Sequence, residues 1–232
     1  MANNRIQTIF NTVSKDYDKM NDIISFKQHN IWRNRTNKEI FVKSDSYILD
    51  LCCGTGDWTI QLSEMNKNAD VVGLDFSEKM LEVAKHKTKD IANISLVQGD
   101  AMNLPYDDKT FDIVTIGFGL RNLPNYKMAI DEVYRVLKPG GQFVILETSN
   151  PKNKIVRALF NFYFGRIMPL FGQVIAKSGE EYKWLYESTR DFVSKEELKE
   201  MMNKSQFINI KVISHNLGMA ATHIGFKQIN HE

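Results

Sequence analysis

The sequence is poor in cysteine, has no long apolar run and carries almost no net charge. Its two cysteines, Cys52 and Cys53, are adjacent and cannot bridge each other without severe strain, so a reducing compartment is expected. No stretch approaches the roughly 18 apolar residues of a membrane span, and the polar N-terminus lacks a signal-peptide core. With 30 Lys+Arg against 28 Asp+Glu, the chain offers no overall positive field for nucleic acid, and no nucleic-acid partner is expected.

What is present is the composition of an ordinary globular protein. The chain has 232 residues, of which 43% are hydrophobic, enough to bury a core without disulfides. We therefore expect a cytoplasmic protein with a single domain, 1–232. Within it we distinguish a helical N-terminal segment or lid, a ligand-binding core, a helical insertion and a terminal hairpin, at residues 1–43, 44–150, 151–205 and 206–232.

Short apolar runs alternate with helix-like stretches through the middle of the chain. The runs predict five strands, at residues 47–53, 71–75, 94–98, 111–118 and 142–148. Because these runs are almost continuously apolar, they indicate a parallel sheet with helices on both faces, a doubly wound α/β fold.

Helices and a hairpin are predicted at the two ends of the chain. Residues 5–43 have helical spacing, interrupted by a polar, aromatic piece at 14–20. The helix predicted over 125–137 ends at Pro139-Gly140-Gly141. Residues 180–203 are predicted to be helical, and residues 207–214 and 220–226 predict a hairpin at the sheet edge.

A glycine-containing loop follows the first predicted strand, and an acidic residue ends the second. Gly54, Thr55 and Gly56 allow a ligand to approach the backbone closely, although a tight turn would use the same residues. Asp75 is placed to accept hydrogen bonds from ribose hydroxyls, with helix capping as the alternative. Since ligands of open α/β sheets bind at the carboxyl ends of the strands, both features predict a site there.

The details of the loop favour a nucleoside cofactor without phosphates. A dinucleotide fingerprint needs a third glycine where this chain has Thr59, and Asp57 adds negative charge at the helix start. Asp100 and Ala101 follow the third strand, where a carboxylate can accept from a purine amine and a small side chain leaves room for the ring. With Asp50, three carboxylates would meet a ligand that has hydroxyls, an amine and a positive centre.

The ordered motifs at 49–56, 73–75, 99–101 and 135–141 resemble those of the class I S-adenosylmethionine-dependent methyltransferases. That resemblance spans 47–148 and implies a mostly parallel seven-stranded sheet with an antiparallel last strand. A narrower resemblance, to the menaquinone/ubiquinone biosynthesis C-methyltransferases, covers nearly the whole chain. It is carried by the motifs at 17–21, 32–33, 50–58, 117–122 and 168–172.

The resemblance implies S-adenosylmethionine as methyl donor, no metal, and C-methylation of the demethylmenaquinol ring. The implied cofactor residues are Gly54, Thr55, Gly56, Asp75, Asp100, Ala101 and Gly117. Other readings are methylation of another small molecule, such as a benzoquinol, and a nicotinamide-dependent oxidoreductase. A nucleic-acid methyltransferase and an inactive binding protein are further alternatives. The nucleic-acid enzyme is disfavoured by the near-neutral charge.

Methylation at a ring carbon requires an electron-rich ring, so the reduced quinol is the expected substrate. Arg121 is the predicted catalytic residue, because a fixed cation could stabilise a phenolate or orient a water that takes the proton; a structural ion pair is the alternative. Asn122 is predicted to hold that water or the quinol oxygen. Tyr17 and His29 are alternative proton acceptors, or simply packing residues.

The aromatic segment 153–172 suggests how an isoprenoid tail is held. Phe160 and Phe164 are predicted to line an apolar groove for the tail, with core packing as the alternative. Lys152, Lys154, Arg157 and Arg166 flank this segment and suit anionic headgroups, so transient contact with the inner face of the cell membrane is expected. A homodimer is also compatible with the sequence.

Overall fold

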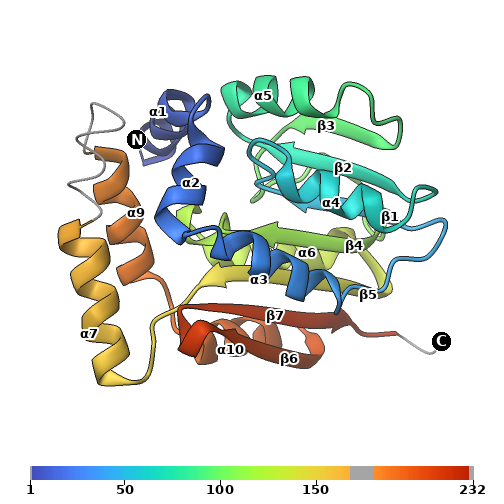
Figure 1. Cartoon of the computed structure of the whole chain (residues 1–232). Coiled ribbons are helices and arrows are strands. Elements are labelled where there is room, and N and C mark those ends of the chain that lie inside the picture. Colours follow the sequence, from blue (N-terminus) through green and yellow to red (C-terminus); the bar gives the residue numbers. More distant parts are fainter. Residues whose placement is uncertain (1, 168–179, 230–232) are drawn as a thin grey trace.

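A seven-stranded sheet forms the centre of the computed structural model, which describes residues 2–167 and 180–229 (Figure 1). Its order is β3-β2-β1-β4-β5-β7-β6, and β7 alone runs antiparallel to both of its neighbours. The strands are β1 (Tyr47–Leu51), β2 (Asp70–Asp75), β3 (Ile94–Gln98), β4 (Phe111–Gly117), β5 (Leu137–Thr148), β6 (Phe207–His215) and β7 (Ala220–Lys227). The predicted sheet and its edge hairpin are confirmed.

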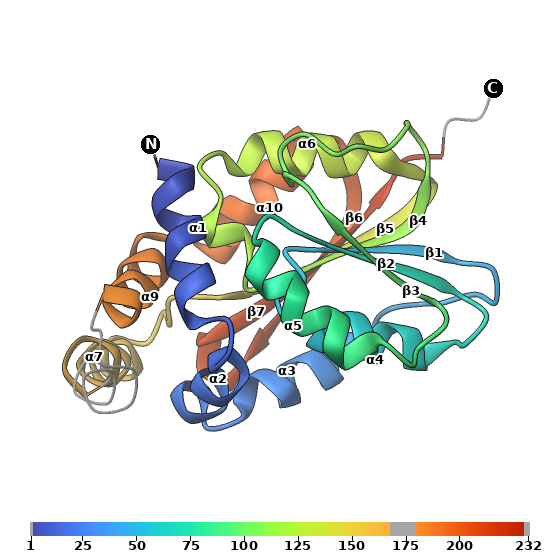
Figure 2. The same ribbon diagram turned by 90° about the horizontal axis from the view of Figure 1, so that it is seen from above.

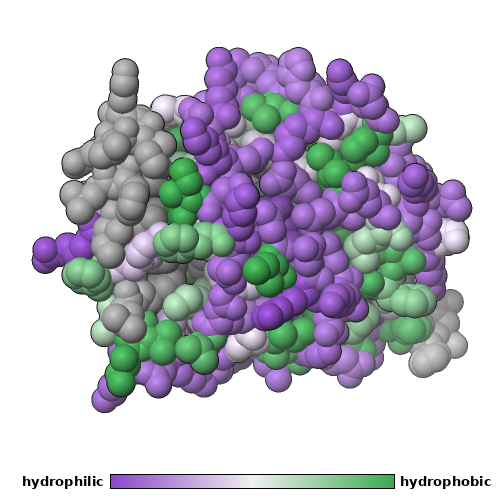
Figure 3. Space-filling view, viewed as in Figure 1, coloured by the Kyte–Doolittle hydropathy of each residue, from purple (hydrophilic) through white to green (hydrophobic). Residues whose placement is uncertain are grey.

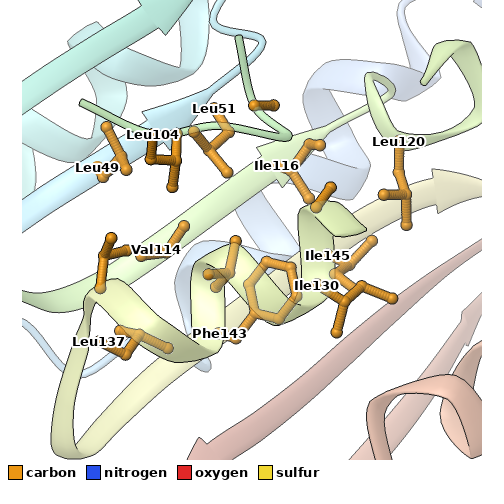
Figure 4. Close-up of a cluster of buried hydrophobic side chains, with 14 of the residues drawn as sticks. Leu49, Leu51, Leu104, Val114, Ile116, Leu120, Ile130, Leu137, Phe143 and Ile145 are labelled. Atoms are coloured by element: carbon orange, nitrogen blue, oxygen red, sulfur yellow. The ribbon is translucent and has the colours of Figure 1, made fainter. Parts of the chain in front are cut away.

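Helices cover both faces of the sheet, as the apolar strands require (Figure 2). On one face α6 (Tyr126–Val136) and α10 (Lys195–Lys204) pack on a buried cluster that includes Leu49 and Phe143 (Figure 4). On the other face α3 (Gln28–Asn37) and α4 (Asp57–Met65) pack on a cluster that includes Ile48. Neighbouring residues such as Ile48 and Leu49 thus serve opposite faces. The helix α5 (Glu78–Thr88) packs beside β2 and β3.

The N-terminal helices divide differently from the prediction. The helix α1 (Ala2–Val13) is followed after a short turn by α2 (Tyr17–Ser25), so the interruption expected over 14–20 is confined to residues 14–16. The chain then breaks before α3 at Phe26 and Lys27, whose φ angles of 48° and 60° are left-handed. Two consecutive left-handed residues end one helix and redirect the next.

The C-terminal part adds detail to the prediction in two places. The helical segment predicted over 180–203 is divided into α9 (Glu180–Asp191) and α10, because Ser194 and Glu197 form a capping box that starts the second helix. The fifth strand begins at Leu137 rather than Gln142, with a register shift against β4 and Gly140 at φ +78°. The glycine allows the bend that a strand of other residues would resist.

Between β5 and α9 lie α7 (Lys154–Phe162) and the π-helix η2 (Tyr163–Ile167). The side chains of Phe160 and Phe164, and all of residues 168–172, lie outside the described part, so the predicted tail groove is not visible there. No helix within residues 2–167 and 180–229 is long and apolar enough to cross a membrane.

A buried carboxylate joins the centre of the sheet to the first helix after it. Asp50 on β1 is 1% exposed and accepts hydrogen bonds from Thr59 Oγ1 on α4 at 2.7 Å and from Thr115 Oγ1 on β4 at 2.8 Å. Burial raises the pKa of Asp50 to about 6, although both hydroxyls favour its ionised form. Each oxygen of Asp50 thus accepts one hydrogen bond from the fold, and the residue also lines a cavity at the carboxyl ends of the strands.

Substitution Asp50→Asn should therefore change how stability depends on pH. The pKa of Asp50 is higher in the folded state than in the unfolded state, so the folded state binds the proton more tightly. The stability that this proton binding contributes is lost as pH rises through about 6. The unfolding free energy of the wild type minus that of Asp50→Asn should fall by roughly 3 kcal/mol between about pH 4 and pH 7. Urea unfolding across that range measures it, with exposed Asp70→Asn as the control; a pH-independent difference would contradict the assignment.

Candidate active site

Two cavities adjoin at the carboxyl edge of the parallel strands. The larger has a volume of about 380 Å³ and the smaller about 90 Å³. Both are walled by the same five residues: Tyr17, Cys52, Gly54, Gly117 and Phe118. The two cavities therefore lie side by side with these residues as a shared wall, so ligands bound in both would be neighbours, as group transfer requires.

The loop between β1 and α4 forms part of this shared wall and has an unusual backbone conformation. Gly54 and Gly56 have left-handed φ angles of +56° and +83°, and Cys52 shares this conformation at 53°. Opposite the loop, a Cβ added to Gly117 would lie 2.6 Å from the Trp58 ring, so this wall accommodates no side chain there. Glycine adopts the left-handed conformation without strain at positions 54 and 56, and its lack of a side chain leaves room for the Trp58 ring at position 117.

Asp75 lies at the end of β2 and lines the smaller cavity. Its carboxylate accepts hydrogen bonds from the amides of Gly54 at 2.9 Å and Ser77 at 2.8 Å. Burial raises the pKa of Asp75, with the amides acting in the opposite direction. The side chain of Ser77 caps α5, so Asp75 is not needed as the helix cap. A carboxylate has about four acceptor positions, and capacity remains for a ligand diol.

Most of the other predicted cofactor residues surround the same small cavity. Asp100 and Ala101 follow β3, and the Asp100 carboxylate accepts from the Met102 amide at 2.8 Å. Thr55 lines only the larger cavity, and Gly56 lines neither cavity but provides the turn. The predicted residues brought together at the smaller cavity are Gly54, Asp75, Asp100, Ala101 and Gly117.

An ion network ties α2 over the loop. Asp18 accepts from Thr55 Oγ1 at 2.5 Å and from Lys87 Nζ at 2.8 Å, and Lys87 also pairs with Asp57. Arg33 lies 3.4 Å from Asp57. Burial opposes ionisation of Asp57, yet Lys87 and Arg33 hold the pKa of its carboxyl below the usual value. Sequence reasoning missed Asp18 and Lys87, because their charges pair only after α2 folds across the loop.

Arg121 in the turn η1 (Leu120–Asn122) lines the larger cavity and is held by a buried ion pair. Its Nη1 lies 2.5 Å from Oε1 of Glu147 on β5, and the two side chains are 7% and 2% exposed. The same Nη1 donates to the Phe118 carbonyl at 2.7 Å, and the Thr148 amide donates to Glu147 at 2.7 Å. Sequence reasoning missed Glu147, although a carboxylate ending an apolar strand was a signal.

Asn122 is fixed by contacts on both sides. Its Oδ1 accepts from Trp184 Nε1 on α9 at 3.1 Å, and its Nδ2 donates to the Phe118 carbonyl at 3.3 Å. It lines the smaller cavity, whereas Tyr17 lines both. Burial raises the pKa of Tyr17, which keeps the phenol protonated and suits a hydrogen-bond donor better than a proton acceptor.

His29 lines the larger cavity, and its hydrogen bonds determine which ring nitrogen carries the proton. The Ser25 hydroxyl donates to the Asn21 carbonyl at 2.7 Å, so its oxygen must accept from His29 Nδ1 at 2.6 Å. The remaining nitrogen, Nε2, therefore carries a lone pair and lies 3.7 Å from Asp22. Burial and then Arg33 lower the pKa of His29, so the ring is neutral near pH 7.

The thiols of Cys52 and Cys53 are expected to be unreactive. Burial and the neighbouring carboxylates Asp75 and Asp50 raise the pKa of Cys52 and of Cys53 well above the usual value. A thiol kept protonated is a poor nucleophile. Among the described residues, no group of three or more His, Cys, Asp or Glu side chains is placed to hold a metal ion.

The chain is similar to known methyltransferases over nearly its whole length. The model of the ubiE/COQ5 methyltransferase family matches residues 1–227. A demethylmenaquinone methyltransferase of Staphylococcus saprophyticus is 52% identical, over 98% of this chain and 100% of its own. One of Staphylococcus aureus is 50% identical, over 98% and 97%.

A solved structure supports the fold. A methyltransferase from Thermotoga maritima, described as S-adenosylmethionine-dependent, superposes with a TM-score of 0.72 at 19% identity, covering 96% of this chain and 100% of its own. The strand order, the glycine loop, Asp75 and the full-length family match agree with one another, and they exclude the nicotinamide-dependent alternative. The chain belongs to the ubiE/COQ5 methyltransferase family and is an S-adenosylmethionine-dependent methyltransferase.

Proposed function

We propose that this enzyme methylates a ring carbon of demethylmenaquinol in menaquinone biosynthesis. The observation that carries the proposal is the pair of adjoining cavities, with cofactor-type residues around the smaller and a buried arginine facing the larger. The relatives with 50–52% identity are named demethylmenaquinone methyltransferases. Substrate and donor meet at the wall of Tyr17, Cys52, Gly54, Gly117 and Phe118.

The donor side fits S-adenosylmethionine. When bound, this cofactor supplies an electrophilic methyl group on a positively charged sulfur. Asp75 accepts from the ribose hydroxyls, and Asp100 with Ala101 receives the adenine. The two carboxylates of the smaller cavity, Asp75 and Asp100, suit hydroxyl and amine donors rather than a phosphate.

The acceptor side makes the ring carbon nucleophilic. Loss of a phenolic proton from the quinol moves electron density onto the ring, and Arg121 stabilises the resulting negative charge. The ring carbon takes the methyl group and loses its own hydrogen as a proton, while the phenolate oxygen regains a proton to restore the quinol, so the net release is one proton for each methyl transferred. His29 Nε2 can accept a proton in the cavity, and Tyr17 can donate a hydrogen bond to a quinol oxygen.

The isoprenoid tail of such a substrate is held by a membrane, so we expect the cytoplasmic enzyme to work at the inner face of the cell membrane. Exposed Lys154, Arg157 and Arg166 on α7 and η2 suit contact with anionic headgroups. Phe160 and Phe164 remain candidates for contact with the tail.

The redox state of the substrate provides the first test. Purified enzyme and S-adenosylmethionine should methylate chemically reduced demethylmenaquinone and leave the oxidised quinone unchanged, because the quinone ring is electron-poor. Mass spectrometry of the extracted quinones measures the product, under anaerobic conditions. Equal methylation of both forms would contradict the phenolate mechanism, and methylation of neither would contradict the substrate.

Substitution Asp75→Asn should weaken cofactor binding selectively. It removes one anionic acceptor from the proposed ribose site, so the Kd for S-adenosylmethionine should rise at least tenfold, corresponding to about 1.4 kcal/mol. Isothermal titration calorimetry measures the Kd. The exposed Asp70→Asn at the opposite end of the same strand is the control; equal affinities in both variants would disprove the assignment.

Substitution Glu147→Gln should change the pH profile. The buried carboxylate compensates the charge of Arg121, and its removal leaves a cation that favours the phenolate more strongly. The acid limb of the kcat–pH profile should move to lower pH by about one unit, while the free energy of unfolding falls by roughly 3–5 kcal/mol.

The double variant Glu147→Gln/Arg121→Gln serves as the control for folding. Two neutral amides remove the uncompensated charge, so stability should recover while activity does not. An alkaline shift of the profile in Glu147→Gln, or full activity in the double variant, would refute the role assigned to Arg121.

A further inference from the structure

Four large apolar side chains stand in solvent around the larger cavity. We call them the apolar rim: Phe26 before α3, Ile155 and Phe162 on α7, and Leu217 between β6 and β7. Their exposures are 72%, 72%, 60% and 77%. In Figure 3 apolar side chains form a green area at the lower left, where Figure 1 shows the start of α7 and the tip of the β6–β7 hairpin. Such clustering on a monomer marks an interaction surface.

Contacts bring the three segments of the rim together at the cavity. The rings of Phe26 and Tyr163 lie 5.7 Å apart, and Tyr163 follows Phe162 directly. Asn216 Nδ2 donates to Gln28 Oε1 at 2.8 Å, which joins the hairpin tip to the start of α3. Phe26, Gln28, Tyr163 and Asn216 all line the larger cavity. Phe26 of the rim thus lines the larger cavity, and the chain neighbours of Phe162 and Leu217, which are Tyr163 and Asn216, line it as well.

Backbone strain accompanies the exposure. Phe26 and Leu217 have φ angles of 48° and 58°, in the left-handed region that bulky residues avoid. An asparagine or a glycine would fit each position with less strain, and a polar side chain would suit the exposure better. Strain and exposure thus coincide at two residues of the rim, which favours a role other than folding for both side chains.

The charges of the residues around the apolar rim indicate which kind of partner would bind there. The segments 26–31, 150–167 and 215–219 contain no Asp or Glu. They hold five exposed basic residues: Lys27, Lys152, Lys154, Arg157 and Arg166. Lys27 lies 3.8 Å from Asp22 and Lys152 lies 2.7 Å from Glu196, both outside these segments. Apolar side chains flanked by cations match an anionic lipid surface, which offers hydrocarbon beneath negative headgroups.

We propose that the apolar rim inserts into an anionic bilayer surface, so that the mouth of the larger cavity faces the lipid. The ring of the substrate then enters the cavity while its apolar tail stays in the bilayer. This inference rests on the proposed quinol substrate and adds to it the surface by which the enzyme reaches that substrate.

The test uses the variant Leu217→Asn/Ile155→Gln, which removes two rim side chains that do not line either cavity. Sucrose-loaded vesicles of phosphatidylglycerol and phosphatidylcholine are sedimented with the full-length protein. The variant should bind anionic vesicles at least tenfold more weakly than the wild type. Its Tm should not fall, because Asn tolerates the left-handed backbone at position 217. Unchanged vesicle binding would overturn the proposal.

Phe41→Ser is the matched control. Phe41 is 77% exposed but lies near the start of β5, where its amide faces Gln142 Oε1 at 3.4 Å, at the edge of the sheet opposite the cavities. Its substitution should leave vesicle binding unchanged. Equal loss of binding in both variants would show nonspecific adsorption and overturn the proposal.

Two further measurements separate the alternatives. Sedimentation velocity without lipid reports self-association; a wild-type dimer that the rim variant dissociates, with vesicle binding unaffected, would assign the rim to a second copy. Methylation of a short-tailed, water-soluble quinol without vesicles tests the proposed function alone. The variant should retain that activity while losing activity on vesicle-bound substrate. If the wild type fails with the soluble quinol yet binds vesicles through the rim, only the proposed function is wrong.

Discussion

The buried carboxylate of Asp50 is the interaction on which the site depends. It holds a hydroxyl from α4 and another from β4, so the loop from Cys52 to Gly56 begins and ends at elements fixed to the same side chain. A carboxylate with both oxygens satisfied inside a sheet is stable only if its partners stay in place. The shape of the loop, and with it the wall between the two cavities, follows from this arrangement.

Charge pairs that form only in the folded chain complete the site. Glu147 fixes Arg121 from the neighbouring strand, and Asp18, Lys87 and Asp57 fix α2 over the loop. These charges lie far apart in sequence and meet only when the elements that carry them pack together. The charge of Arg121 in the larger cavity is consequently compensated in part by Glu147 behind it.

The sheet and the glycine loop could be predicted because each depends on residues that are close together in the sequence. Continuous apolar runs require burial on both faces, and Gly54 and Asp75 follow strands at a fixed offset. The sequence could not predict Glu147 or Lys87, whose partners are set by strand order and helix placement. The break between α9 and α10 was also not specified by the helical spacing, because it depends on the capping box of Ser194 and Glu197. The hydrogen bonds that Asp50 accepts from Thr59 and Thr115 could not be predicted either, since these partners come from other elements.

The two cavities differ in what covers them. Ile6, Gln7 and Phe10 of α1 help to enclose the smaller one, and the side chain of Asn11 accepts from Ser77 Oγ at 2.7 Å just beyond it. No residue of α1 lines the larger cavity, which is walled instead by residues of α2, α3 and the β6–β7 hairpin among others. A shift of α1 alone would therefore reshape the smaller cavity and leave the walls of the larger one in place.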